Sequence, residues 1–244
     1  MRIGKKIGML LVKLGVGAGL ILWLVEKVNW SVVLEKLADI SPVFIVLYIV
    51  FQLAGNVISA RKWQTIASHK HQELMFTVKE GFFTYLTGAF INNFLPSTIG
   101  GDAYRGLWLA QKTEAKAASL STVVFDRFIG LWTTAILALF CSIPLWKHFF
   151  TDTAFRLTML ALVLFLLVDL FVTYAYFQPW FHRMLAWLPF KLQRLIQEVI
   201  GFTKKGIWTI GSLYSVLFAL VGIALSNWML FHALGSPVDF FSFL

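Results

Sequence analysis

A polar, glycine-rich segment interrupts an otherwise apolar sequence at residues 92–106, which read NNFLPSTIGGDAYRG. The apolar residues beside it, 82–90 and 107–109, are too short to cross a bilayer. Irregular backbone survives at membrane depth only where protein or a water-filled cavity supplies its hydrogen-bond partners. The segment is therefore predicted to line a buried site that the rest of the chain shields from lipid.

Composition assigns the chain to the membrane proteins. Of 244 residues, 59% are hydrophobic and 14% are charged, whereas a soluble domain carries about 25% charged residues. The predicted fold class is an all-α, polytopic membrane helix bundle. The net charge of +9 is divided among short basic clusters between apolar segments. This pattern is typical of cytoplasmic loops beside anionic lipid and argues against a nucleic-acid partner.

Several apolar segments are long enough to form membrane-spanning helices, and no cleavage signal follows the first. Arg61, Lys62 and Trp63 follow the second segment and are typical of a cytoplasmic interface. Apolar residues recur on one helical face at about 190–203, which predicts an amphipathic surface helix. The predicted spans are about 7–25, 43–59, 117–146, 155–177 and 207–231.

The distribution of Lys and Arg predicts a topology. A cytoplasmic N-terminus places most of these residues on the cytoplasmic side, as the positive-inside rule requires. The rule holds along the whole chain only if residues of about 80–111 leave and return on the same side. We therefore predict a re-entrant broken-helix hairpin there, in a multi-pass protein of the inner or plasma membrane.

Each residue type in the polar segment suits a ligand site. Pro96 would break the helix, and Gly100 and Gly101 would let a ligand approach the backbone. Asp102 is expected to cap a short helix that starts directly after it, whose N-terminal amides favour an anion. Arg105 can pair with Asp102 one turn away or hold a phosphate in a bidentate contact. The alternative is a tight turn in which this Asp and Arg neutralise each other.

Other polar residues extend this candidate site. Asn92 and Asn93 offer donors and acceptors that suit a lipid headgroup. Asp126 and Arg127 lie several residues into a predicted span, where charge is costly and functional groups concentrate. A local ion pair, or a contact with the arginine of the polar segment, is the alternative. Asp169 lies deep in another span and needs a partner or a proton, so pairing and a proton relay both stay open.

No metal, cofactor or catalytic site is predicted. His69 and His71 have no third ligand nearby in the sequence, so a solvated loop is the favoured interpretation. The sequence also lacks a paired-carboxylate set on a loop, a nucleophile beside a base, and a nucleotide-binding loop.

The polar segment, followed by FDRFIGLW at residues 125–132, resembles the lysylphosphatidylglycerol synthase transmembrane family. That family is the flippase-like membrane domain of the multiple peptide resistance factor. Its pattern corresponds here to Asn93, Leu95-Pro96, Gly100-Gly101-Asp102, Arg105, and Asp126-Arg127 before Gly-Leu. The resemblance covers nearly the whole chain. It implies one flippase-like domain, residues 1–244, that moves phosphatidylglycerol, its aminoacylated form or a related lipid between leaflets.

The sequence departs from the family in two ways. It ends before a second proline- and glycine-rich motif, and it lacks the soluble aminoacyltransferase domain of the synthases. The resemblance therefore implies an N-terminal portion or a truncated frame without transferase activity of its own. The membrane part of a lysyltransferase-type enzyme and a non-transporting scaffold are the alternatives. The expected partners are the membrane and anionic phospholipid, and a second copy or a soluble synthase partner stays open.

Overall fold

The computed structural model is helical, which confirms the all-α class, and no strand occurs in the part of the chain that it describes. The first predicted span, about 7–25, lies largely outside that part. The described residues are 15, 17, 19–20, 22–70, 74–94, 99–202, 206–236, 238 and 240. Among them, the helices long and apolar enough to cross a membrane are Pro42–His69, Lys116–Cys141, Thr153–Tyr176 and Ile207–Ala233.

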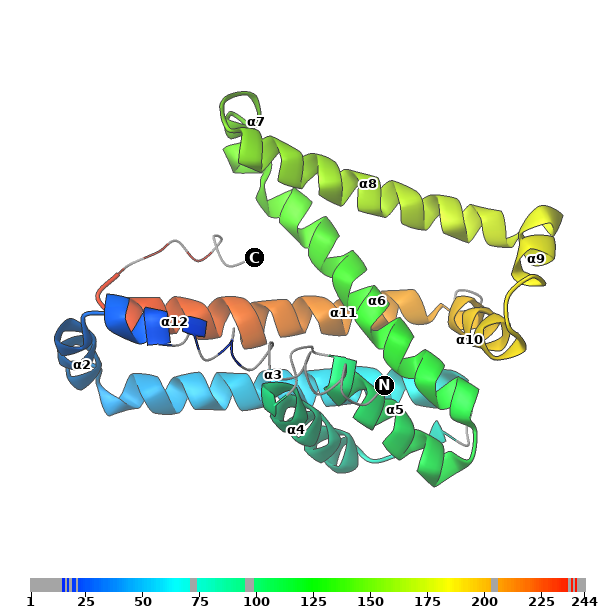
Figure 1. The fold of residues 1–244 in the computed structure, drawn as a ribbon, viewed down its shortest axis with the longest axis horizontal. Helices are drawn as coiled ribbons and strands as arrows, with labels where there is room; N and C mark the ends of the chain where they lie inside the picture. Colours follow the sequence, from blue (N-terminus) through cyan, green and yellow to red (C-terminus); the bar gives the residue numbers. More distant parts are fainter. Residues whose placement is uncertain are drawn as a thin grey trace.

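Two long helical rods lie side by side and antiparallel in the bundle (Figure 1). One is α3 (Pro42–Lys70), which follows the short helix α2 (Trp30–Ala38). The other is α11 (Ile207–Phe218), which continues through the π-helical segment η4 (Ala219–Leu225) into α12 (Ser226–Ala233). Because glycines lie where the rods meet, the two backbones approach closely at this contact.

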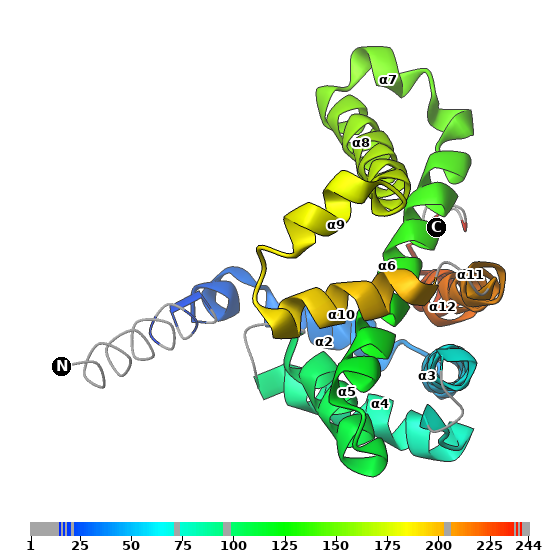
Figure 2. The ribbon, with the colours of Figure 1, turned by 90° about the vertical axis from the view of Figure 1, so that its right-hand side faces the viewer.

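The described residues of the polar segment, 92–94 and 99–106, lie in a pair of packed helices, here called the hairpin: α4 (Val78–Phe94) and α5 (Ile99–Thr113) (Figure 2). Helix α4 begins with a reciprocal cap. The Glu80 carboxylate accepts from the Thr77 backbone N–H at 2.7 Å, and the Thr77 hydroxyl accepts from the Glu80 N–H at 3.2 Å. Neither helix is among those long enough to span a membrane, and re-entry of the pair into the bilayer stays a prediction.

Glycine permits the contact between these two helices. A Cβ atom on Gly101 would overlap the Gly88 carbonyl oxygen and lie 2.8 Å from the Asn92 amide nitrogen. The Gly101 backbone N–H donates to the Asn92 side-chain oxygen at 2.7 Å. Pro96, which was expected to break the helix, lies outside the described residues.

Helix α6 (Lys116–Cys141) crosses α11 and leads away from the hairpin (Figure 1). Its end lies five residues before the predicted boundary at Trp146, and a 3-10 turn at Ile143–Leu145 follows it. After α7 (His148–Thr151), α8 (Thr153–Tyr176) returns at an angle to α6. Its exposed apolar side chains are those expected of a lipid-facing helix.

A short connection leads from α8 back to the bundle through α9 (Pro179–Leu185) and α10 (Phe190–Ile200). The structure has a helix where the amphipathic surface helix was predicted, and it packs against α6. The ring of Phe202, just after α10, stacks on Phe125 of α6 with centroids 4.4 Å apart. This contact joins α10 to the helix that carries Asp126.

Helix α3 continues past the predicted end of the second span near residue 59, and Trp63 is not the exposed interfacial residue that was expected. Helix α3 continues to Lys70, and the Trp63 side chain is fully buried. The indole packs on Phe76 with centroids 4.4 Å apart and donates to the Thr122 hydroxyl at 3.0 Å. The last turns of α3 are therefore buried against the hairpin and α6.

Candidate functional site

A cavity of about 420 Å³ lies where α3, α4, α5, α6 and α11 meet. Most of the lining side chains are ionisable or carry a hydroxyl group, and the others are apolar. These polar side chains come from distant parts of the sequence, and the fold brings them together between helices that are otherwise apolar. The lining residues are Ser59, Lys62, Tyr85, Asp102, Arg105, Asp126, Arg127, Gly130, Leu131, Thr134, Ser215 and Phe218.

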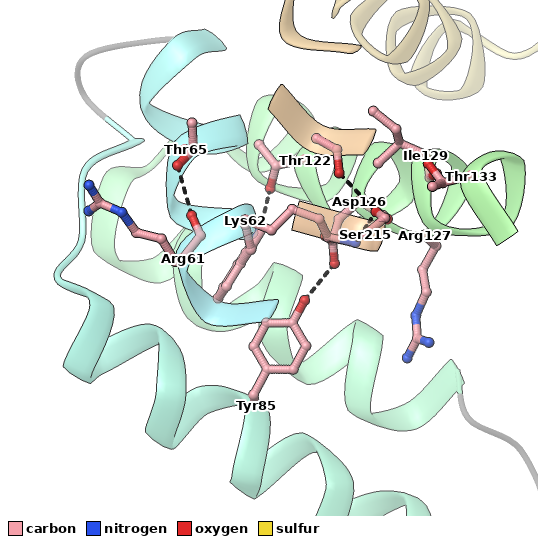
Figure 3. A network of polar contacts seen from close by, with 12 residues as sticks. Arg61, Lys62, Thr65, Tyr85, Thr122, Asp126, Arg127, Ile129, Thr133 and Ser215 are labelled. Carbon is pink, nitrogen blue, oxygen red and sulfur yellow. Dashed lines mark hydrogen bonds and ion pairs between the residues drawn. The ribbon is translucent and has the colours of Figure 1, made fainter. Parts of the chain in front are cut away.

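Asp126 is the centre of the polar network (Figure 3). One carboxylate oxygen lies 3.0 Å from the Lys62 ammonium. The other accepts from the Arg105 guanidinium at 2.8 Å and from the Tyr85 hydroxyl at 2.6 Å. All these partners come from different helices. A buried carboxylate with two cations and a hydroxyl is held as an anion in a fixed position.

A second carboxylate lies closer to the surface. Asp102 contacts Arg105 at 3.3 Å and accepts from the Arg127 Nε at 2.8 Å. The i, i+3 pair expected from the sequence is therefore present, and Arg127 binds Asp102. The capping role expected for Asp102 is wrong, because α5 begins at Ile99 and Asp102 lies within its first turn. The Arg127 side chain is 52% exposed, so one face of this ion pair is open.

Aromatic rings orient Arg105. Its guanidinium carbon lies 3.7 Å from the centroid of the Tyr85 ring and 4.6 Å from that of Trp63. The Arg105 Nε is buried and has no hydrogen-bond partner among the described residues. The cavity lining contains Lys62, Arg105 and Arg127 against Asp102 and Asp126. This surplus of positive charge favours an anionic ligand.

Comparison with known proteins agrees with this membrane architecture. The family model described as "Lysylphosphatidylglycerol synthase TM region" matches residues 10–244. The chain belongs to this family. A UPF0104 membrane protein of Methanocaldococcus jannaschii, MJ1595, is 29% identical over 138 residues. That alignment covers 56% of this chain and 39% of the relative, and no solved structure matches the chain.

The cavity collects only some of the residues predicted for the site. Asp102, Arg105, Asp126 and Arg127 meet there, including the Arg105–Asp126 contact that the sequence left open. The Asn92 side chain instead binds the α5 backbone within the hairpin. Three further candidates do not line the cavity: Asn93 is exposed, and Gly100 and Gly101 lie in the first turn of α5. Pro96 lies outside the described residues.

Asp169 lies away from this network, on α8. It borders a separate apolar cavity of about 200 Å³ whose lining includes Phe128, Phe165 and Trp208. Pairing and a proton relay at Asp169 both stay predictions.

Sequence reasoning missed Lys62, Tyr85 and Ser215. Lys62 carried a usable signal, because a cation within a long apolar helix is a functional candidate. That signal was lost when Lys62 was assigned, with Arg61, to an interface. Tyr85 and Ser215 have no distinguishing pattern among the many hydroxyl and aromatic residues of the apolar segments.

Proposed function

We propose that this chain binds the phosphate headgroup of an anionic phospholipid in the cavity and moves it between leaflets. The observation that carries the proposal is the surplus positive charge of a polar cavity built within apolar helices. Family membership supports a lipid-related role in the membrane. The acyl chains of the bound phospholipid would stay in the bilayer, beside the exposed apolar side chains of α3 and α8.

The two carboxylates suit different roles in this proposal. Asp126 is buried and bound by Lys62, Arg105 and Tyr85, so it would stay in place. Asp102 holds the exposed side of the network through Arg127. A phosphate group can replace a carboxylate on a guanidinium while keeping two parallel hydrogen bonds. The headgroup would therefore displace Asp102 from Arg127.

A second candidate function follows from the family description, which names a synthase. The same cavity would then hold the acceptor lipid for a soluble aminoacyltransferase. The headgroup would bind to the same cations, but it would react at the membrane surface and would not need to cross to the other leaflet.

Leaflet exchange of a fluorescent phosphatidylglycerol in vesicles that contain the purified chain tests the proposal. Arg105→Ala and Arg127→Gln should each slow exchange at least about tenfold, since each removes a charge-assisted contact to the phosphate. Arg61→Gln is the matched control, because Arg61 is exposed on α3 and binds Gln64. Absence of exchange with the unmodified chain, or exchange unaffected by both site variants, would contradict translocation. Lysine transfer to the lipid that requires an added synthase would favour the second function.

A further inference from the structure

Polar and small residues line one face of α3. They recur at intervals of three and four residues, which places them in a single stripe along the helix. The opposite face is apolar and exposed, as at Val46, Leu53 and Val57. The stripe, called here the α3 seam, consists of Tyr48, Gln52, Gly55, Ser59 and Lys62.

The α3 seam faces the α11–α12 rod along most of its length. The Lys62 ammonium donates to the Ser215 hydroxyl at 3.4 Å. Further along, the Gln52 amide donates to the Ser226 hydroxyl at 3.4 Å and to the Tyr48 hydroxyl at 3.2 Å. The polar contacts therefore continue well beyond the cavity that contains Asp126.

A constriction separates these two groups of polar contacts. A Cβ atom on Gly55 would lie 2.8 Å from the Gly222 Cα and 3.4 Å from the Phe218 ring. Phe218 also lines the cavity, together with Ser59 and Ser215. Phe218 therefore lies both in the cavity wall and beside the close approach of Gly55 and Gly222.

The α3 seam is long enough to cross much of the hydrocarbon core of a bilayer. Tyr48 and Lys62 are about 21 Å apart along the axis of α3, at about 1.5 Å per residue. The hydrocarbon core of a bilayer is about 30 Å thick. Close packing of two membrane helices requires only small residues. The Gln52 amide and Tyr48 hydroxyl are larger than close packing needs. Polar side chains inside a membrane bundle join helices or face a water-filled pathway.

The helix opposite the constriction is itself irregular. The π-helical segment Ala219–Leu225 lies between Phe218 and Ser226. π-helical turns interrupt the regular hydrogen-bond ladder and are frequent at functional sites. A return of this segment to α-helical geometry would rotate α12 relative to α11, which would separate Gly222 from Gly55.

We propose that the α3 seam is the route by which the phospholipid headgroup crosses the membrane. Gln52, Tyr48 and Ser226 form a second polar station, and the Phe218–Gly55–Gly222 contact is the closed constriction before it. This inference rests on the proposed translocation function. At the cavity end, the exposed side chain of Arg127 is where a headgroup would begin the route.

Gln52→Leu tests the second station without altering the cavity. Exchange of fluorescent phosphatidylglycerol should slow about tenfold, because a desolvated headgroup would lose a hydrogen-bond partner. The affinity for dioctanoyl phosphatidylglycerol, measured by tryptophan fluorescence, should change less than twofold, because the cavity cations are intact. Asn56→Leu is the matched control, since the Asn56 side-chain amide donates to the Gln52 backbone carbonyl within α3. That variant should exchange lipid at the unmodified rate.

Thiol accessibility gives a second readout that does not depend on transport. In a Cys141→Ala background, Gln52→Cys should react with a membrane-impermeant thiol reagent in vesicles. Leu53→Cys, one residue away on the exposed apolar face, should not react. Equal reactivity at the two positions would overturn the inference, because a headgroup route must admit water.

The failures of the two proposals are distinguishable. Normal exchange by Gln52→Leu, together with loss of exchange in Arg105→Ala, would overturn the seam route and leave translocation through the cavity intact. Absence of exchange by the unmodified chain would overturn translocation, and the headgroup route with it.

Discussion

The Arg105 guanidinium donates to the Asp126 carboxylate at 2.8 Å, and each side chain is only 3% exposed. The contact joins α5 of the hairpin to α6. Two buried ions in contact gain little net free energy over an apolar pair, but removal of one leaves the other buried and unpaired. The pair therefore fixes the position of the hairpin against α6 and with it the shape of the cavity.

Asp126→Ala is expected to destabilise the folded protein by about 3–5 kcal/mol, since the buried Lys62 loses its anion and Arg105 keeps only the longer contact to Asp102. The free energy of unfolding can be measured by detergent denaturation in mixed micelles. Asp102→Ala is the matched control, and its cost should be smaller because Asp102 and its partner Arg127 are more exposed. Equal costs for the two carboxylates would refute the central role of Asp126.

Arg127→Gln should separate ligand binding from stability. Because the Arg127 side chain is 52% exposed, loss of its ion pair should change the free energy of unfolding by less than about 1 kcal/mol. Affinity for short-chain phosphatidylglycerol should nevertheless fall about tenfold, since a bidentate phosphate contact is lost. Titration of the intrinsic tryptophan fluorescence measures this affinity. A large loss of stability without a loss of affinity would show that Arg127 is a structural residue.

Gly101→Ala should destabilise the hairpin by about 1–3 kcal/mol through overpacking. The new methyl group would overlap the Gly88 carbonyl oxygen on α4, and backbone cannot move aside as a flexible side chain can. Thermal unfolding in detergent, compared with that of Gly130→Ala, checks this expectation. A Cβ at position 130 would meet Lys62 Nζ at an ordinary 3.6 Å, so the control should unfold like the unmodified protein.

The parts of the fold that could be predicted are those that depend on local patterns. Apolar run length placed the helices that begin at Lys116, Thr153 and Ile207 to within two residues at their starts. The Asp102–Arg105 contact was also predictable, because it joins neighbours within one turn. Local composition, however, does not show where a charged side chain points, and this is why Lys62 and Trp63 were assigned to an interface although both are buried.

The centre of the site depends on how helices cross. Lys62 and Tyr85 reach Asp126 only because α3 and α4 both pack near α6. A single sequence carries no signal for such a crossing, and a lysine beside an arginine and a tryptophan has the composition of an interface. The burial of Lys62 could therefore be found only from the assembled structure.

The Glu80–Lys112 ion pair joins α4 and α5 at 2.6 Å, outside the spanning helices. The Lys112 hydrogen bond and the Thr77 backbone N–H lower the pKa of Glu80 from 4.5 to about 2. Because the folded-state pKa is depressed, the stabilisation is fully present above about pH 4.5 and is lost as the pH falls towards 2. Both side chains are more than a third exposed, so the ion pair contributes less than about 1 kcal/mol. The free energies of unfolding of Glu80→Gln and of the unmodified protein should therefore differ at pH 7 and coincide near pH 2. A difference that persists at pH 2 would show that the negative charge of Glu80 is not its source.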